Sequence, residues 1–562
     1  MTHLLQRLVR FIFSKDAGYL VRDDILERRL ECCALVSSVT SFVNPRNRPL
    51  ELLHKAVGAL DVILDQTFSI EENTIIIDQG IDNRLAFRWC LQEPQTPRRI
   101  AWVQGREDFE SIRRAYEAAM SLGISLVILD GPGHWMEDDR GAYSYLREAF
   151  IPVCIDVDEG FVERIVASVK GFHLPIDGIV TISDVRLPGV AAASEILGLP
   201  TEPSLAYSLA GDKGATRGLE MSHNDSSWFI TIPSIDEMRP ILASKRETIQ
   251  YPVVVKPCVG WNSECVAKCH NEAEIANAVI RASDRHANSP KRSTGAIIEP
   301  YIDGPELDAN MVLLDGEVLF FEAADDFPSS ADQHGQHKGA NFMETQVVIP
   351  SKLPENELDL LRNSVRESIL RQGFRSGVFH CEARIQNSKA QYVVHENDLQ
   401  DLEQKHLPTD VYHPTSVYLL EINARPPGYL ESVATLLAYG VDYYALRLLF
   451  ALGTKEYSRI QRLAQPFRSG PQFHLSMTII PATIGGIMKT EDATLDLLLR
   501  YPQLRDVIVD YKSSKKRGDF VQGPESSELW WVAYLSIISR TSRRDLLEKV
   551  LFVRSHFKYE VE

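Results

Sequence analysis

Short apolar runs alternate with helix-like segments between residues 100 and 200, and this rhythm restricts the fold more than any other feature of the chain. The apolar runs predict strands at 100–105, 125–131, 151–158 and 176–184. Helical periodicity predicts helices at 111–123, 161–172 and 191–200. Strands that alternate with helices form a parallel, doubly wound sheet. The region lacks a GxGxxG sequence, so it offers no support for a dinucleotide site.

Composition then excludes several classes of protein. The chain has 562 residues, 44% of them hydrophobic, so about three or four domains are expected. A formal charge of -17 argues against a nucleic-acid partner, which needs clustered Lys and Arg. Eight cysteines without a CxxC pair favour reduced thiols and a cytoplasmic location. We expect no membrane span, because no apolar run reaches about 18 residues.

The first 95 residues carry no motif with a clear role. Residues 1–18 are basic and partly amphipathic, which leaves a transit peptide as one alternative. The acidic residues Asp16, Asp23 and Asp24 follow at once, and they favour an ordinary first helix instead.

From about residue 205 the pattern predicts hairpins. One hairpin is expected at 251–268 and a second at 306–324, with its turn at Asp315-Gly316. Further strands are expected at 296–302, 376–386 and 416–428, a helix at 271–287 and a surface loop at 387–415. The long polar segment 325–345 is a candidate lid.

Two groups of potential metal ligands receive no role. The spacing of Cys258, Cys265 and Cys269 beside His270 matches no standard zinc pattern, which favours buried thiols. His334 and His337 lie in the polar segment, where solvated side chains are the simpler interpretation.

The last two strands carry polar side chains at every second position. Residues two apart on a strand share a face, so Glu421, Asn423 and Arg425 point the same way. Glu382 lies on the corresponding face of the other strand, between His380 and Arg384. Paired strands would bring Glu382 and Glu421 together, and like charges in that position need a cation. Carboxylate and amide oxygens suit Mg²⁺. The alternative is a solvated face whose carboxylates pair with the two arginines.

Two upstream segments would suit a nucleotide. Lys256 ends an apolar strand at the mouth of a loop with Gly260 and Ser263, where amides and an ammonium can hold phosphates. Residues 299–306 place two carboxylates around a short connector whose backbone could read a base edge.

The order of these parts resembles the ATP-grasp carboxylate–amine ligases. The matching parts are Asp212-Lys213 and the segments 253–266, 299–306, 380–385 and 420–428. The resemblance covers roughly residues 95–450, and it is closest to L-amino acid ligases and carnosine synthase-like enzymes that form dipeptides. It implies an α/β (α+β) chain with four parts: a region 1–95 of unclear role, a Rossmann-like domain 96–204, an ATP-grasp domain 205–450 with a lid at about 220–300, and a small C-terminal domain 451–562.

The resemblance also implies a role for each matching residue. Lys213, Lys256 and Ser263 would hold the ATP phosphates. The adenine hinge would be Glu299, Tyr301 and Ile302, with Glu306 at the ribose. The magnesium ligands would be Glu382, Glu421 and Asn423. Arg425 would stabilise charge at the acyl centre. The phosphate loop departs from the family pattern, because it has Trp261, Asn262 and Glu264 in place of small residues.

The implied reaction uses ATP and Mg²⁺, with Mn²⁺ as a substitute, to phosphorylate a carboxylate that an amine then attacks. The products would be an amide, ADP and phosphate. Expected partners are small-molecule carboxylate and amine substrates and a second copy of the chain in a homodimer. One alternative is a biotin-dependent carboxylase-like enzyme, for which Met488-Lys489 is the nearest approach to a carrier lysine. The other is a nucleotide-binding regulator without turnover.

Overall fold

The computed structural model describes residues 6–13, 19–20, 29, 36–39, 53, 56–85, 90–91, 96–222, 228–260, 263–287, 293–332, 341–405, 414–523 and 531–562. The chain divides into two compact units. The first comprises Met1–Val153, Ser168–Val180 and Thr435–Gln472. The second comprises Cys154–Ala167, Thr181–Ala434 and Phe473–Glu562.

A parallel sheet forms the centre of the first unit and confirms the β-α-β prediction. Its order is β8-β7-β6-β9, and all three pairings are parallel. The strands are β6 (Arg98–Val103), β7 (Ile124–Asp130), β8 (Ala149–Pro152) and β9 (Gly178–Val180). The connecting helices are α4 (Arg113–Ser121) and α5 (Phe161–Gly171), of which α5 belongs to this unit only from Ser168 onward. The later helices α13 (Tyr443–Phe450) and α14 (Tyr457–Leu463) also belong to this unit, where α13 packs against α4.

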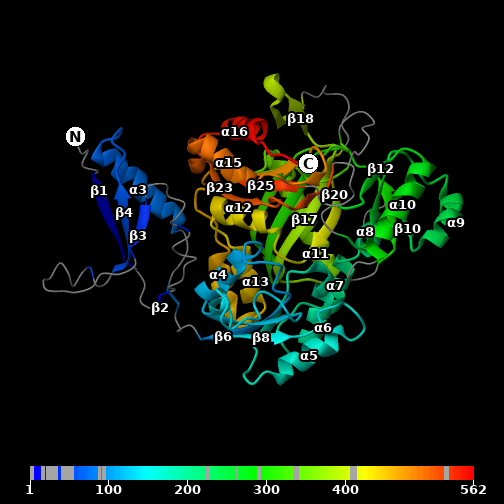
Figure 1. Ribbon diagram of the computed structural model, residues 1–562, viewed down its shortest axis with the longest axis horizontal. Helices are drawn as coiled ribbons and strands as arrows, with labels where there is room; N and C mark the ends of the chain where they lie inside the picture. Colours follow the sequence, from blue (N-terminus) through cyan, green and yellow to red (C-terminus); the bar gives the residue numbers. More distant parts are fainter. Residues whose placement is uncertain are drawn as a thin grey trace. The chain divides into compact units, whose positions relative to one another are not determined.

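The predicted first helix is wrong, because the structure has a strand there. β1 (Arg7–Phe13) pairs antiparallel with β4 (Ala56–Ile63), which also pairs with β3 (Val36–Val39). The partner of β1 lies about 50 residues away in sequence, so local periodicity could not reveal the pairing. Figure 1 shows these strands beside α3 (Ile70–Arg84), whose first turn is closed by a capping box. A short pair, β2 (Tyr19–Leu20) and β5 (Cys90–Leu91), completes the region.

An antiparallel sheet of eight strands dominates the second unit, in the order β20-β17-β14-β15-β16-β21-β25-β23. The strands are β14 (Glu306–Leu314), β15 (Glu317–Asp326), β16 (Gln346–Ile349), β17 (Gly377–Gln386), β20 (Ser416–Asn423), β21 (His474–Pro481), β23 (Ile508–Ser513) and β25 (Trp531–Ser539). The predicted turn at Asp315-Gly316 is confirmed, with φ of 53° and 86°. Positive φ at both positions fits a type I′ hairpin turn.

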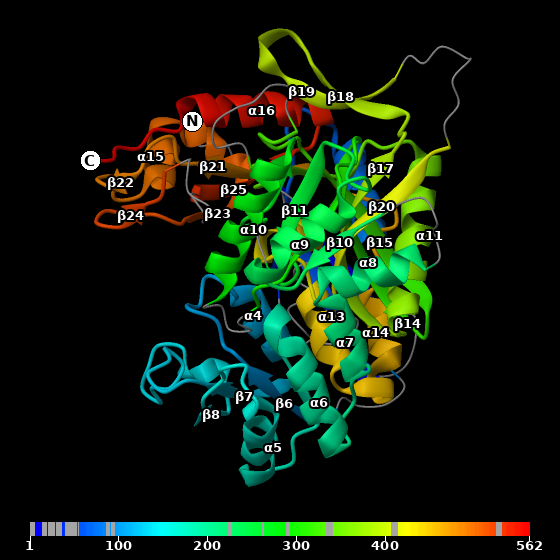
Figure 2. The ribbon, with the colours of Figure 1, turned by 90° about the vertical axis from the view of Figure 1, so that its right-hand side faces the viewer.

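One face of this sheet is buried against helices. α11 (Glu355–Gln372) contacts β14, β17 and β20, and α7 (Ser204–Ala210) and α8 (Lys213–Met221) pack beside it (Figure 2). The apolar side chains of Leu307, Phe379 and Ile385 point into this core. Their alternate neighbours along the strands therefore point to the opposite face, where the polar residues gather.

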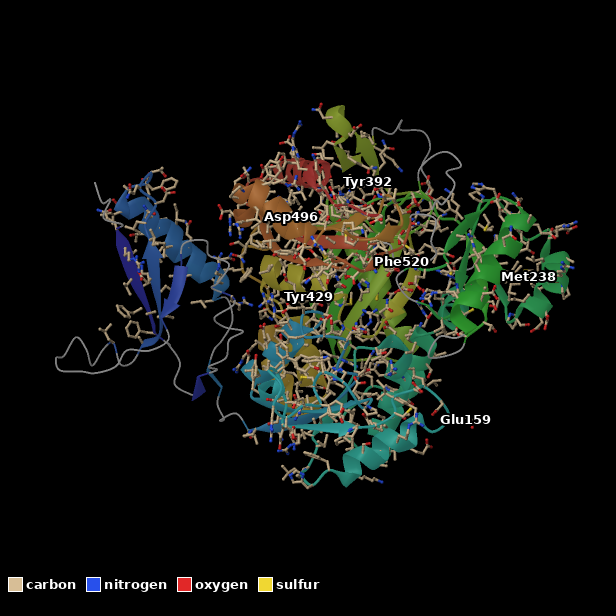
Figure 3. The ribbon with its side chains drawn as sticks, viewed as in Figure 1. Glu159, Met238, Tyr392, Tyr429, Asp496 and Phe520 are labelled. Carbon is tan, nitrogen blue, oxygen red and sulfur yellow. The ribbon has the colours of Figure 1, made fainter. Side chains whose placement is uncertain are left out.

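A second, smaller sheet has the order β10-β13-β11-β12 and confirms the predicted hairpin and helix. The strands are β10 (Ile230–Ile232), β11 (Val253–Pro257), β12 (Ala267–Cys269) and β13 (Ala296–Pro300). The helices are α9 (Ile235–Lys245), which carries Met238 in Figure 3, and α10 (Glu272–Ala287). Their apolar side chains share one core with the sheet.

The predicted surface loop at 387–415 is wrong over most of its described part. β18 (Ala390–Val394) and β19 (Gln400–Gln404) form a hairpin there, and Tyr392 of β18 (Figure 3) donates a hydrogen bond to the Asp326 carbonyl. Further elements of the unit are α6 (Leu187–Leu197), α15 (Ala493–Arg500), α16 (Arg543–His556), β22 (Gly486–Ile487) and β24 (Phe520–Val521). The helix α12 (Tyr429–Tyr439) begins in this unit, and its residues from 435 onward belong to the first. No single helix in the described parts of the chain could cross a membrane by length and composition, although the bent pair α12 and α13 together would pass that test.

Candidate active site

A cavity of about 330 Å³ opens between the smaller sheet and the polar face of the larger one. Every site residue that the sequence predicted lies on its wall. These residues are Lys213, Lys256, Ser263, Glu299, Tyr301, Ile302, Glu306, Glu382, Glu421, Asn423 and Arg425. Five separate parts of the chain thus meet at one site.

The two predicted metal-binding carboxylates lie side by side. Glu382 on β17 is directly opposite Glu421 on β20. Lys213 forms an ion pair with Glu421, and the Asn423 amide donates to the same carboxylate at 2.7 Å. Burial raises the pKa of Glu421, but the Lys213 ammonium outweighs it and lowers that pKa below its usual range. Burial and the charge of Glu421 raise the pKa of Glu382 to about 7.

The surrounding carboxylates show that the site suits a cation. Burial raises the pKa of Asp308, Asp326 and Glu344 well above the usual range, and each is raised further by neighbouring carboxylates. Repulsion of this kind is relieved by a bound positive charge. The oxygen donors of Glu382, Glu421 and Asn423 therefore fit Mg²⁺. The alternative of a solvated face is wrong, because these strands line a buried cavity and their arginines pair with other carboxylates.

The two predicted phosphate lysines reach the cavity from different elements. Asp212 caps α8 by accepting from the Ala215 amide, and Lys213 is the first residue of that helix. Lys256 lies on β11, is buried, and pairs with Glu299 at 2.5 Å. Both ammonium groups are thus held beside the carboxylates while they line the cavity.

The side chain of Glu299 is fully engaged within the protein. Arg217 pairs with it at 3.0 Å, opposite Lys256, and the Tyr418 hydroxyl donates to it at 3.2 Å. Burial opposes ionisation of Glu299, but the two cations lower its pKa overall. Sequence reasoning missed Arg217, because a lone arginine in a helix has no distinguishing pattern. Recognition of a base at this segment would therefore use backbone groups, as predicted for part of the hinge.

Arg384 forms an ion pair with Glu306, the carboxylate that was predicted to bind the ribose of ATP. It pairs with Glu306 at 2.6 Å and with Asp332 at 2.8 Å, and the Tyr301 hydroxyl donates to Asp332 at 2.9 Å. Asp332 lies in the described part of the segment 325–345, which sequence reasoning treated only as a candidate lid. His334 and His337 lie outside the described residues.

Arg425 is held by a carboxylate that the sequence did not single out. Its guanidinium makes two hydrogen bonds to Asp184, at 2.6 and 2.8 Å. Bidentate pairs of this kind fix the plane of the guanidinium as well as its position. The pair orients Arg425 on the cavity wall, because Asp184 lines the same cavity.

The acidic residue in the predicted phosphate loop forms an ion pair with a residue of a neighbouring helix. Glu264 is buried, and Arg285 of α10 pairs with it at 2.9 Å. Its neighbours Ser263 and Cys265 have φ of 52° and 62°, in the left-handed region where non-glycine residues are uncommon. Trp261 and Asn262 lie outside the described residues. The charge of Glu264 is thus neutralised by the protein itself.

The cysteines behave as predicted. Cys258, Cys265 and Cys269 are buried, and burial raises the pKa of Cys258 and of Cys269 to about 12. Such thiols stay protonated and are poor nucleophiles and poor metal ligands.

The chain matches family models and individual proteins of the ATP-grasp family. The ATP-grasp N-terminal domain matches residues 116–201, and the ATP-grasp domain matches residues 249–400. The ATP-grasp enzyme fsqD of Aspergillus fumigatus is 34% identical over 98% of this chain and 97% of its own length. Carnosine synthase 1 of Gallus gallus is 24% identical over 60% of this chain, which corresponds to 33% of that larger protein.

Solved structures of ATP-grasp proteins have a similar fold. The L-amino acid ligase from Bacillus licheniformis superimposes with a TM-score of 0.61 at 19% identity, over 84% of this chain and 100% of its own. Phosphoribosylglycinamide synthetase from Anaerococcus prevotii gives a TM-score of 0.52 at 16% identity, over 83% of this chain and 100% of its own. The chain therefore belongs to the ATP-grasp family, as a carboxylate–amine ligase.

Proposed function

We propose that the enzyme joins the carboxylate of one small amino-acid-like substrate to the amine of another through an acyl phosphate, and that it cleaves ATP to ADP and phosphate. The observation that carries this proposal is the direct opposition of Glu382 and Glu421, with Lys213, Lys256 and Arg425 on the same cavity wall. Transfer of a phosphoryl group to a carboxylate brings together two anions, so it requires this concentration of cations and metal ligands.

In this proposal Lys213 and Lys256 hold the ATP phosphates, and Ser263 lies in the loop beside them. Glu382, Glu421 and Asn423 would hold Mg²⁺, which when bound neutralises phosphate charge and orients the γ-phosphoryl group. The hinge residues 299–302 would bind the base. These residue roles and the division of the chain into four parts stay predictions.

Arg425 would act on charge that develops during the reaction. Attack of the amine on the acyl phosphate places negative charge on the acyl oxygen, and a guanidinium held in one plane can stabilise it. The bidentate contact with Asp184 keeps Arg425 in place before substrate arrives.

The substrate class rests on two kinds of support. The relatives include proteins named for amino acid ligation and for carnosine synthesis. A carrier function has little support, because Met488 is fully buried in a bridge to Val561 and Lys489 pairs with Glu562. A biotin-bearing lysine would need a mobile turn. A cytoplasmic location and a homodimer remain predictions.

The test is release of ADP by the purified enzyme with Mg²⁺ATP and amino acids, offered singly and in pairs. We expect the largest release with one particular pair, together with a new amide detected by mass spectrometry. Glu421→Gln provides the background, since it keeps the shape of the side chain and removes its charge. Release that never exceeds this background with any pair would contradict the proposal.

A further inference from the structure

Three side chains that the proposed reaction does not use lie together on the polar face of the large sheet. They are Asp308 of β14, His380 of β17 and Glu431 of α12. One potential ligand atom from each lies within 4.8 Å of those from the other two. None of the three is a predicted magnesium ligand, but they adjoin one of those ligands, Glu382, which is opposite Asp308 in the sheet and lies 3.7 Å from His380 Nε2.

The carboxylate of Asp308 lacks the partner that a buried charge requires. Its side chain is only 1% exposed, and its Oδ2 has no hydrogen-bond partner in the described part of the chain. No basic side chain among the described residues forms an ion pair with Asp308, Asp326 or Glu344. A buried, unpaired carboxylate is costly unless a cation or a proton compensates it.

A hydrogen bond to a neighbouring side chain orients the imidazole of His380. Its Nδ1 lies 2.9 Å from the Asn310 side-chain oxygen, to which it donates, and the Asn310 amide in turn donates to Glu322 at 2.7 Å. Metal-binding histidines commonly donate one ring nitrogen to a carbonyl or carboxylate in this way. Nδ1 also lies 3.5 Å from Glu431, and Nε2, which keeps the lone pair, lies 3.7 Å from Glu382.

We propose that Asp308, His380 and Glu431 bind a divalent metal ion separate from the magnesium that accompanies ATP. One imidazole with two carboxylates favours Mn²⁺ or Zn²⁺, whereas the all-oxygen set at Glu421 and Asn423 favours Mg²⁺. The ion would tie β14, β17 and α12 together. It would also fix His380 and Glu431, which line the active-site cavity.

The first test titrates the chelator-treated full chain with Mn²⁺ in the absence of nucleotide and measures free Mn²⁺ by electron paramagnetic resonance. We expect one ion per chain, and we expect Asp308→Asn to weaken its binding by about tenfold or more. Glu322→Gln is the matched control, because the substituted amide oxygen can still accept from Asn310. Glu421→Gln should also retain the ion. Binding that is unchanged in Asp308→Asn, or lost in Glu421→Gln, would overturn the proposal.

A second measurement needs no variant and so does not depend on how a variant folds. Pulsed electron paramagnetic resonance of the wild-type protein with one Mn²⁺ and no nucleotide should show coupling to a ¹⁴N nucleus of the imidazole. An all-oxygen signal would overturn the proposal. Because neither measurement uses ATP or a substrate, the result is independent of the ligase reaction.

Discussion

Asp325 and Asp326 are neighbours on β15, yet they point to opposite faces of the same sheet and have opposite surroundings. Asp325 is fully buried, and Arg543 pairs with it at 2.7 Å. Asp326 is also buried, but no described basic side chain pairs with it, and its Oδ1 has no hydrogen-bond partner among the described residues. One face of the sheet has balanced charge, while the other carries an excess of carboxylates.

On the balanced face, the ion pairs link elements of the fold to one another. Arg543 of α16 also pairs with Asp401 at 2.7 Å, and Lys352 completes the set by pairing with Asp401 at 2.7 Å. Two carboxylates thus meet two cations, and α16 is tied to the sheet. Burial still raises the pKa of Asp325, but Arg543 opposes that shift.

The unbalanced face is arranged for ligands. Burial and the charge of Glu344 raise the pKa of Asp326, burial raises the pKa of Glu344, and the charge of Glu382 raises both pKa values further. A protein keeps such repulsion where a bound cation or a reaction requires it. We therefore expect residues on the balanced face to stabilise the fold and residues on the other face to bind ligands. Substitutions on each face can test this expectation.

The largest effect is expected for turnover on the unbalanced face. Glu382→Gln and Glu421→Gln should each lower kcat by about 10³-fold or more, because each removes a charged metal ligand beside the phosphates. The melting temperature should hold in Glu382→Gln, because a repelling charge is removed, and it should fall in Glu421→Gln, because the buried Lys213 ammonium loses its charged partner. Steady-state kinetics and calorimetry check both statements, with the exposed Glu317→Gln as control. Ligase activity near that of wild type in either variant would remove the metal assignment.

The next effect concerns stability on the balanced face. Arg543→Ala should lower the free energy of unfolding by about 3–5 kcal/mol, because it leaves Asp325 and Asp401 buried without their cation. The adjacent Arg544 is an exposed member of a helix pair, so Arg544→Ala should change stability by only about 0.5 kcal/mol. Denaturant titration measures both. Equal losses in the two variants would mean that the contact of Arg543 is not structural.

A smaller effect should distinguish binding from catalysis inside the cavity. Lys256→Ala should weaken ATP affinity by about tenfold, because its ammonium would meet phosphates in the ground state and transition state alike. Arg425→Ala should instead lower kcat by about 100-fold with little change in ATP affinity. Nucleotide binding by calorimetry and single-turnover kinetics separate the two. An unchanged kcat in Arg425→Ala would contradict its assigned role.

The smallest effect is a gain in stability. The folded-state pKa of Asp326 is raised by burial and by Glu344, Glu306, Glu382 and Asp332, so ionising it costs folding free energy. Wild type should therefore lose stability relative to Asp326→Asn as pH rises above about 4, the unfolded-state value, toward the folded-state pKa. Below pH 4 the two proteins should be equally stable. A variant that is less stable than wild type at pH 7 would show that Asp326 is compensated after all.

The sequence predicted those parts of the site whose signal is local. Period-two alternation placed Glu382 and Glu421 on matching faces, and the strand register confirms it. The same alternation places Asp308 beside Glu306, and it could have revealed the third carboxylate. Arg217 and Asp184 could not be found, because their roles depend on contacts with Glu299 and Arg425 far along the chain. β1 and the β18–β19 hairpin were missed because their pairing outweighs weak local propensity.

The most direct test of the central claim traps the activated carboxylate. The enzyme is given ATP, Mg²⁺, a carboxylate substrate identified by ADP release, and hydroxylamine in place of the amine. An acyl phosphate predicts a hydroxamate formed in equal amount with ADP and phosphate, and no product in Glu421→Gln. Formation of AMP and pyrophosphate with the hydroxamate would show that the carboxylate is adenylated, and it would contradict the mechanism proposed for this site.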